Sequence, residues 1–181
     1  MPKNLEFKAS VDDVAGLEKA FTGIGAQFTA VLNQRDIYFN VRSGRLKQRE
    51  VEGKSAELIY YERDEASSSE MLSRYSVVPI HDASVKDMLS KALGVKVVVE
   101  KTRRLLMLKN ARIHLDAVKN LGTFLEFEVV SSGRTPSEQG DDKADAELLE
   151  KLKRIAASFV DKEINASYSD LVILAGCESN S

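Results

Sequence analysis

The chain has 181 residues, 43% of them hydrophobic and 30% charged, which is the size and composition of one globular domain with a hydrophobic core. Its 26 Lys and Arg against 28 Asp and Glu give a formal net charge of -2, which argues against a general nucleic-acid binder. With one cysteine, no signal-like segment at the start and no apolar run that could span a bilayer, we expect a cytoplasmic protein without membrane contact.

Strands dominate the predicted elements. Leu5-Glu6-Phe7-Lys8 alternates apolar and charged residues, which is the period of a half-buried strand. Along the chain we predict a helix at 11–25, strands between 28 and 61 and at 73–80, a helix at 84–94, strands at 97–107, 111–117 and 122–130, and a helix at 143–160. Strand and helix do not alternate regularly, so a doubly wound parallel sheet is not favoured. The pattern predicts an α+β protein with a mainly antiparallel sheet.

Charged residues share one face of almost every predicted strand. A solvated outer face is the ordinary interpretation of one such strand. Here, however, basic residues gather on some strands and carboxylates on others, and three amphipathic helices can cover the apolar faces. We therefore predict that the sheet curls into a barrel with the charges inside. The basic residues of this lumen are Lys8, Arg45, Lys47, Arg49, Arg63, Lys101, Arg103 and Arg112, and its carboxylates are Glu6, Asp116, Glu126 and Glu128.

This charge pattern predicts the chemistry of the occupant. Crowded like charges in a partly dehydrated space repel one another, so the basic residues favour a polyanion and the carboxylates a metal cation. A triphosphate with Mg²⁺ or Mn²⁺ meets both requirements, because Arg and Lys bind phosphate oxygens and carboxylates bind hard cations. No convincing covalent nucleophile is found in the sequence, which favours direct attack at phosphorus.

The same segments resemble the CYTH family, also called triphosphate tunnel metalloenzymes, which includes class IV adenylyl cyclases, thiamine triphosphatases and inorganic tripolyphosphatases. They are residues 4–8, 34–39, 44–49, 57–63, 100–103, 112–116, 121–128 and 167–171, in the family's order over nearly the whole chain. The sequences of these segments are most similar to the class IV adenylyl cyclase-like branch of the family. The resemblance implies one CYTH-like domain at 1–175, an eight-stranded antiparallel barrel with helices packed outside, and a possible homodimer. From the sequence itself we expect a frayed tail at 176–181.

The resemblance also implies roles for individual residues. It assigns the metal to Glu6, Asp116, Glu126 and Glu128, and catalysis to Glu6, Lys8, Glu126 and Glu128. It assigns phosphate binding to Lys8, Lys47, Arg49, Arg63, Lys101 and Arg103. The charge pattern of the strands adds Arg45 and Arg112, and Tyr61 completes the predicted substrate-binding residues. Two residues depart from the family pattern. Asn4 replaces the first Glu of the opening motif, and Tyr61 stands where several hydrolytic members carry a phosphate-binding Lys.

Three functions remain open at this point. The first is hydrolysis of the terminal phosphate of tripolyphosphate or an organic triphosphate, which we favour. The second is cyclisation of ATP to cyclic AMP and pyrophosphate, and the third is a catalytically weak polyphosphate or nucleotide binder. Tyr38 or Tyr61 could contact a base or sugar, and His114 is either a general acid or base or a hydrogen-bonding residue of the lumen.

Overall fold

The computed structural model describes residues 3–63, 71–131 and 139–178. The strands are β1 (Lys3–Val11), β2 (Gln27–Phe39), β3 (Arg45–Val51), β4 (Ala56–Arg63), β5 (Met71–Ile80), β6 (Val95–Leu108), β7 (Ala111–Val118), β8 (Gly122–Ser131) and β9 (Val160–Glu163). The helices are α1 (Val14–Gly23), α2 (Ser84–Leu93), α3 (Gln139–Ala156) and α4 (Tyr168–Glu178), and the 3₁₀ turn η1 (Ala157–Phe159) follows α3.

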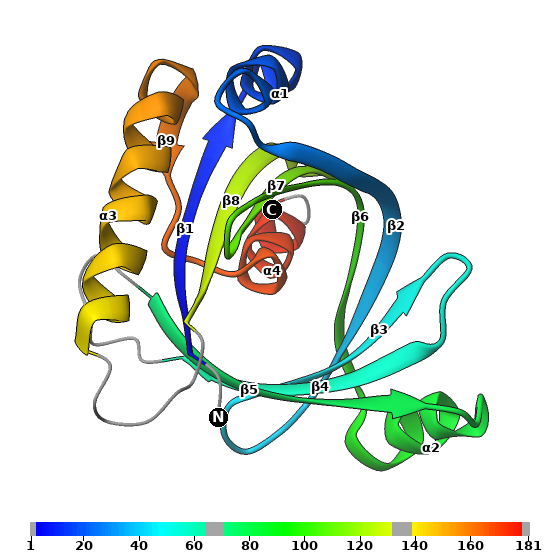
Figure 1. Ribbon diagram of the computed structural model, residues 1–181. Helices are drawn as coiled ribbons and strands as arrows, with labels where there is room; N and C mark the ends of the chain where they lie inside the picture. The colour runs from blue at the N-terminus through cyan, green and yellow to red at the C-terminus, as the bar shows by residue number, and fades with distance from the viewer. Residues whose placement is uncertain (1–2, 64–70, 132–138, 179–181) are drawn as a thin grey trace.

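In the described part of the chain the nine strands form one antiparallel sheet in the order β5-β4-β3-β2-β6-β7-β8-β1-β9. Strand β1 makes an additional pairing with β5, over Lys3–Glu6 and Met71–Arg74. The sheet therefore curves strongly, as Figure 1 shows. The prediction of an α+β protein with a mainly antiparallel sheet is confirmed.

The predicted number of eight strands is wrong, because the described residues hold a ninth. The expected helix at 143–160 begins earlier, at Gln139, and ends at Ala156, where the backbone tightens into η1. Val160 is extended, with φ -83° and ψ 122°, and the chain from there to Glu163 pairs with the end of β1. A β-branched residue after a tight turn favours this change from helix to strand.

The hydrophobic core lies between the sheet and the helices α1 and α3. Leu17 and Phe21 of α1 are fully buried, and Phe21 meets Phe127 of β8 edge-on at 5.5 Å between ring centroids. Phe7 of β1 stacks on the same Phe127 at 5.6 Å. Burying such a side chain contributes roughly 1.5–3 kcal/mol. The apolar face of β1 and β8 is thus used against the helices, which leaves their charged face for the inside of the curve.

Helix α1 is shorter than the predicted helix at 11–25. Val11 remains in β1, and the side chain of Asp13 accepts a hydrogen bond from the backbone N of Gly16 at 2.8 Å. An aspartate in this position satisfies an amide that the first turn of a helix leaves unpaired. The helix therefore begins after Asp13 and ends at Gly23.

Helix α4 packs differently from the other helices, because its first residue is buried and lines the space that the sheet surrounds. In Figure 1, α4 lies within the outline of the sheet, whereas the other three labelled helices lie around it. Tyr168, its first residue, is buried in an apolar cluster with Phe124 and Val99 and contacts the Phe124 ring at 5.2 Å. Burial of the Tyr168 side chain stabilises this position of the start of α4, because it removes a large apolar surface from water.

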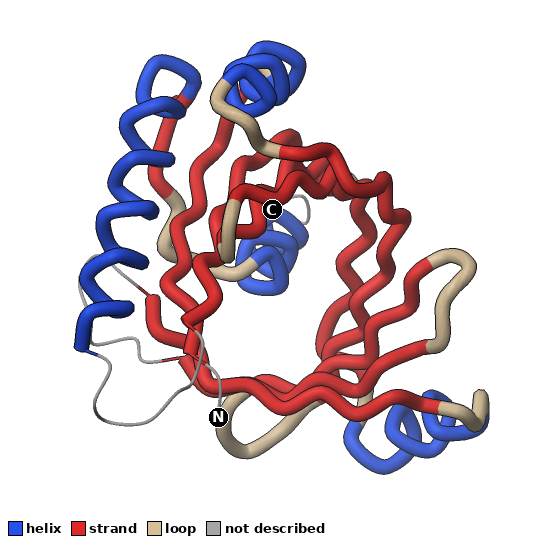
Figure 2. Tube along the Cα trace, viewed as in Figure 1, coloured by secondary structure: helices blue, strands red, loops and turns tan. Residues whose placement is uncertain are grey.

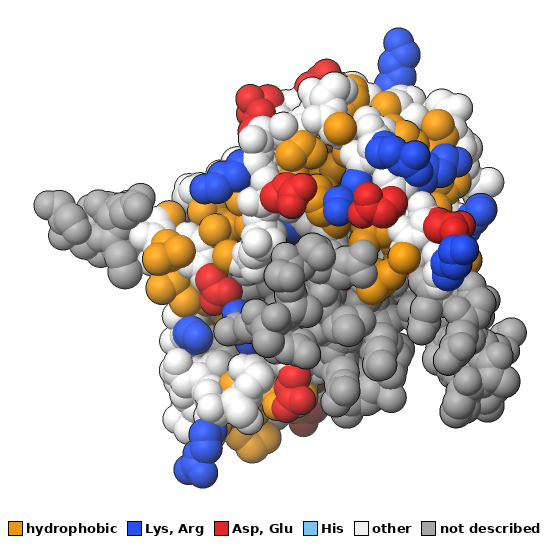
Figure 3. Space-filling model, turned by 90° about the vertical axis from the view of Figure 1, so that its left-hand side faces the viewer, with side chains coloured by type: hydrophobic (Ala, Val, Ile, Leu, Met, Phe, Trp, Pro, Cys, Tyr) orange, Lys and Arg blue, Asp and Glu red, His pale blue; other side chains and the backbone are white. Residues whose placement is uncertain are grey.

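The outer surface shown in Figure 3 carries basic and acidic side chains interspersed with hydrophobic ones. Mixed charges of this kind are typical of an ordinary solvated surface. None of the helices in the described residues combines the length and the apolar composition needed to cross a bilayer.

Candidate functional site

The curved sheet surrounds a cavity of about 320 Å³. All the strands from β1 to β8 contribute to its wall, together with the start of α4. Figure 2 shows how the strands follow one another around the curve of the sheet. The charged lining residues are Glu6, Lys8, Asp36, Lys47, Arg49, Glu57, Lys101, Arg103, Arg112, Glu126 and Glu128, and the uncharged ones are Tyr38, Ile59, Tyr61, Val77, Ser167 and Tyr168. Most of the charges predicted to share the inner faces of the strands thus meet in one space.

On one wall, the carboxylate of Asp36 on β2 holds two cations of β3. Lys47 Nζ donates to Asp36 Oδ2 at 2.7 Å, and Arg49 donates to both oxygens at 2.9 Å. We call these three residues the Asp36 cluster. Burial alone would raise the pKa of Asp36, but the charges of Lys47 and Arg49 outweigh it and lower the pKa well below its usual range. Asp36 therefore stays ionised and fixes both cations.

On the opposite side of β2, strands β6 and β7 repeat this construction. Arg103 on β6 donates to both oxygens of Asp116 on β7, at 2.7 and 2.6 Å, and Lys101 Nζ donates to Asp116 Oδ2 at 3.1 Å. We call these three residues the Asp116 cluster. Burial, together with the charge of Arg103, lowers the pKa of Lys101 to about 8, although Asp116 opposes the shift. Burial would raise the pKa of Asp116, but the two cations lower it below its ordinary value.

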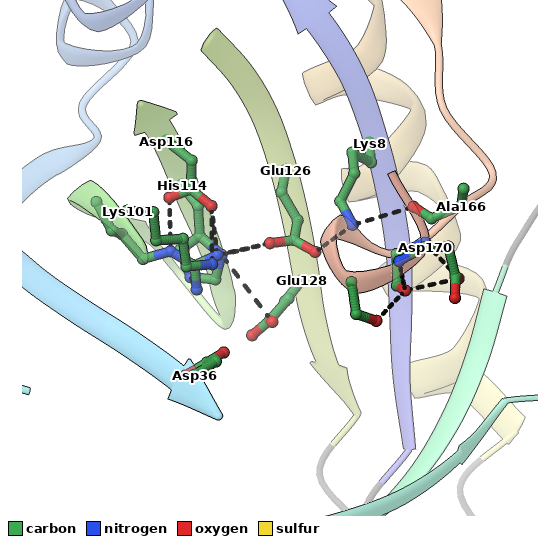
Figure 4. A network of polar contacts seen from close by, with 12 residues as sticks. Lys8, Asp36, Lys101, His114, Asp116, Glu126, Glu128, Ala166 and Asp170 are labelled. Carbon is green, nitrogen blue, oxygen red and sulfur yellow. Dashed lines mark hydrogen bonds and ion pairs between the residues drawn. The ribbon is translucent and has the colours of Figure 1, made fainter. Parts of the chain in front are cut away.

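Glu126 on β8 joins the Asp116 cluster to β1. Its Oε2 accepts from Arg103 Nη2 at 2.7 Å, and its Oε1 lies 3.4 Å from Lys8 Nζ. Figure 4 shows Glu126 between Lys8 and His114. His114 Nδ1 lies 3.4 Å from the same Oε2. Burial would raise the pKa of Glu126, but Lys8, the His114 hydrogen bond and Arg103 together lower it well below its usual range. Glu126 is thus a buried carboxylate that neutralises cations on two neighbouring strands.

A second carboxylate, Glu128, lies two residues farther along β8. It pairs across the sheet with Glu6 on β1 and with Arg112 on β7, whose Nη1 lies 3.5 Å from Glu128 Oε2. Burial would raise its pKa, yet it is lowered, mainly by the charge of His114 when protonated. One ligand atom each from His114, Glu126 and Glu128 lie within 4.8 Å of one another, so this group could hold a metal ion.

Tyr168 of α4 organises the lysines at this end of the cavity. Lys8 Nζ lies 4.2 Å from the centre of its ring, and Lys101 Nζ lies 4.7 Å from it. Lys8 also approaches the carbonyl oxygen of Ala166 at 3.5 Å. An aromatic face attracts ammonium groups, so the ring lets two like charges approach each other in a buried place.

The structure places the predicted site residues as follows. Those that line the cavity are Glu6, Lys8, Lys47, Arg49, Tyr61, Lys101, Arg103, Arg112, Glu126 and Glu128. Asp116 is fully buried and holds two cations, and does not itself line the cavity. Arg45 does not line the cavity: its Nη2 donates to Asp170 of α4 at 2.8 Å, and its guanidinium lies 5.9 Å from the centre of the Tyr61 ring. The side chains of Arg63 and Asn4 lie outside the described residues, so their predicted roles stay predictions.

Sequence reasoning missed several residues of the cavity. Asp36 was not predicted, although it shares a strand face with Tyr38 and pairs across the sheet with Arg49. Glu57 of β4 pairs with Arg49 from the other side. The spacing of Asp36 and Tyr38 contained this signal, but only the register between strands reveals which cation the carboxylate meets. Tyr168 was not predicted as a site residue, and no periodic pattern in the sequence places it beside the cavity.

Comparisons with solved structures show the same fold. The PH1012 protein from Pyrococcus horikoshii is 23% identical, with a TM-score of 0.71 over 93% of this chain and 98% of that one. A candidate adenylate cyclase from Vibrio parahaemolyticus is 18% identical, with a TM-score of 0.69 over 93% and 97% of the two chains. HpAC1 from Hippeastrum, a protein described with a dominant triphosphatase activity, is 12% identical, with a TM-score of 0.61 over 91% and 92%.

The comparison with curated proteins gave no match. The sequence model of the CYTH domain matches residues 2–164, which include every strand of the sheet and end four residues before α4. The inward charges, their arrangement around one cavity and this match agree on one conclusion. The chain belongs to the CYTH domain family.

Proposed function

We propose that the protein is a divalent-metal-dependent enzyme that binds a triphosphate in this cavity and hydrolyses its terminal phosphate. One observation supports this most directly: among the described residues, cations from four strands meet in the cavity opposite a group of carboxylates. The cations are Lys8, Lys47, Arg49, Lys101, Arg103 and Arg112. We further propose that the β1–β5 pairing closes strands β1 to β8 into a tunnel, which would limit access to its two ends.

The carboxylates suit a hard cation such as Mg²⁺ or Mn²⁺. Glu126 and Glu128 on β8 and Glu6, opposite Glu128 on β1, offer oxygen ligands within one part of the wall. Asp116 fits this role less well, because Arg103 and Lys101 already occupy its oxygens. When bound, the metal would supply positive charge against the phosphate oxygens and favour the ionised form of a water.

The side chains of the protein would bind the phosphates, orient the reacting phosphorus and accept a proton. The two aspartate clusters would hold the phosphates by charge-assisted hydrogen bonds and orient the terminal phosphorus. As the water oxygen bonds to that phosphorus, the bond to the bridging oxygen breaks, and the diphosphate stays bound to the cations. Glu6 or Glu128 would accept the proton that the water loses.

Cyclisation of a nucleoside triphosphate is the second candidate, and the β4–β5 wall favours it. Ile59, Tyr61 and Val77 line the cavity there, with Tyr38 of the neighbouring β2. An apolar and aromatic wall can accommodate the organic group of a nucleotide. Inorganic tripolyphosphate has no such group, so this wall favours an organic triphosphate. Cyclisation would also require the ribose 3′-oxygen in line with the α-phosphorus, a demand for which no residue is yet identified.

A product analysis distinguishes these reactions. Purified protein is incubated with tripolyphosphate or ATP and Mg²⁺ or Mn²⁺, and the products are separated by chromatography, with EDTA as the control. We expect phosphate release that requires metal and produces no cyclic AMP. Cyclic AMP with pyrophosphate as the main products would replace hydrolysis with cyclisation, and tight binding without turnover would indicate a binding protein.

A further inference from the structure

His114 lies between a cation and a carboxylate of the proposed site. It projects from β7 and is 3% exposed. Its Nε2 lies 3.5 Å from Arg103 Nη1, and its Nδ1 lies 3.4 Å from Glu126 Oε2. Figure 4 shows it beside both β8 carboxylates, of which Glu128 is farther away, at 4.0 Å.

These two neighbours determine where the imidazole carries its proton. A guanidinium group has only N–H donors, so Nε2 can interact favourably with Arg103 only as an acceptor. A neutral imidazole has one donor and one acceptor nitrogen, and its hydrogen is therefore on Nδ1. From there it points to Glu126 Oε2, which accepts it.

We propose that His114 is a positioning residue: a neutral imidazole that accepts from Arg103, donates to Glu126 and so holds the two side chains in a fixed relation. This inference rests on the proposed function for its catalytic meaning, because Arg103 would bind phosphate and Glu126 would bind the metal. Lys8 approaches Oε1 of Glu126 at 3.4 Å, and His114 adds a neutral donor beside Arg103 at Oε2, so both oxygens of the carboxylate are held in place.

The alternative is that His114 is itself a metal ligand. The group formed with Glu126 and Glu128 is compact enough, since its ligand atoms lie within 4.8 Å of one another. Ligation through Nδ1, however, moves the hydrogen to Nε2, where it faces the N–H groups of Arg103. Arg103 cannot withdraw without breaking its two hydrogen bonds to Asp116, at 2.7 and 2.6 Å. The imidazole therefore serves the carboxylate that binds the metal.

Nitrogen NMR of the wild-type protein without metal tests the tautomer directly. The sequence contains only two histidines, and the exposed His81 provides the internal reference for assignment. We expect the His114 ring at neutral pH to carry hydrogen on Nδ1 alone. Hydrogen on Nε2 alone, or on both nitrogens, would overturn the proposal. This measurement needs no variant and does not depend on whether the protein is an enzyme.

Mn²⁺ binding, followed by electron paramagnetic resonance without substrate, tests the positioning role. His114→Ala should weaken Mn²⁺ binding by about 10- to 100-fold, which is the range for losing a residue that hydrogen-bonds to a metal ligand. His114→Asn keeps an N–H donor near the Nδ1 position and should recover most of the affinity, whereas His114→Gln should not. A directly coordinated nitrogen in the wild-type spectrum that disappears in His114→Ala would overturn the proposal in favour of ligation. Wild-type protein that binds no Mn²⁺ would contradict the proposed function and leave the tautomer result standing.

Discussion

The Asp36 cluster and the Asp116 cluster have the same construction but different surroundings. In each, a buried aspartate holds a lysine and an arginine that lie two residues apart on the neighbouring strand. Arg49 keeps 21% of its side chain exposed, however, whereas Arg103 keeps 6%. Arg103 also contacts Glu126, which links the Asp116 cluster to the carboxylates of β8.

This difference suggests a division of labour in one cavity. A cation pair that meets a single carboxylate is already positioned and needs only a phosphate to complete its partners. A pair that also neutralises Glu126 must be released from that negative charge, without leaving its place, before it can attract phosphate fully. A metal on Glu126 would provide that release, because it takes over the neutralisation of the carboxylate. We therefore expect the Asp36 cluster to bind phosphate alone and the Asp116 cluster to couple phosphate to metal.

The largest expected effect concerns stability. Asp116→Asn leaves Lys101 and Arg103 buried without their main anion, and breaking a buried ion pair in this way costs about 3–5 kcal/mol. Asp36→Asn should cost less, because water reaches the more exposed Arg49. Chemical denaturation of both variants measures the difference. A loss for Asp36→Asn that equals or exceeds that for Asp116→Asn would end the distinction between the clusters.

The pH dependence of unfolding provides a control for this pair. Both aspartates have a folded-state pKa below the ordinary value of about 3.9. Their contribution to stability is therefore complete above that value and is lost as the pH falls through the folded-state pKa. The gap in stability between wild type and Asp116→Asn should narrow in acid, and a constant gap would show that the charge of Asp116 is not responsible.

Glu126→Gln tests the coupling of metal to phosphate. It removes the carboxylate that neutralises Lys8 and Arg103, so tripolyphosphate should bind about tenfold more tightly without metal. The same change should abolish metal-dependent turnover. Glu128→Gln is the matched control on the same strand, since Glu128 lies 3.5 Å from Arg112 and holds neither Lys8 nor Arg103 by a short ion pair. Calorimetry without metal that finds weaker binding to Glu126→Gln would contradict the proposed release.

The two arginines should differ in how their loss depends on metal. Arg49→Ala and Arg103→Ala should each weaken tripolyphosphate binding by about 1–3 kcal/mol, the range for a lost charge-assisted hydrogen bond. For Arg103 the loss should be larger with Mg²⁺ than without it, because Glu126 competes for this side chain only when no metal is bound. Arg35→Ala, on the outer face of β2, is the control and should change little. Unchanged affinity in both variants would remove these residues from the site.

The sequence predicted the inner face of the strands better than the partners across it. Alternation with a period of two identified Lys47, Arg49, Lys101 and Arg103, because a strand places every second side chain on the same face. It did not identify Asp36 as the partner of the first pair, nor the role of Asp116 as the partner of the second. Those contacts depend on the register between strands, which depends on turns and distant pairing.

The ends of the fold were harder to predict for the same reason. Arg45 shares the strand face of Lys47, yet it binds Asp170, a residue more than a hundred positions away in sequence. The motif at 167–171 gave no helical period, so α4 and the burial of its first residue beside the cavity were missed. Contacts between segments far apart in sequence determine both features, and a local pattern carries no information about them.

The smallest expected effect is the pH dependence of binding through Lys101. Its pKa of about 8 means that the folded protein begins to lose this positive charge just above neutral pH. A bound triphosphate favours the charged form and raises that pKa, so binding above about pH 8 takes up a proton and the affinity falls as the pH rises. One proton limits this fall to about tenfold per pH unit.

Lys101→Arg, whose guanidinium remains charged, should show a flatter dependence of binding on pH. Calorimetry of metal-free tripolyphosphate binding between about pH 7 and 10 compares the two proteins, and the comparison removes the contribution of the ligand's own protonation. Parallel curves would mean that the buried ammonium keeps its proton throughout. In that case Asp116 offsets the effect of burial on Lys101 more fully than the lowered pKa of Lys101 indicates. The Asp116 cluster would then keep both of its positive charges for phosphate, as the Asp36 cluster does.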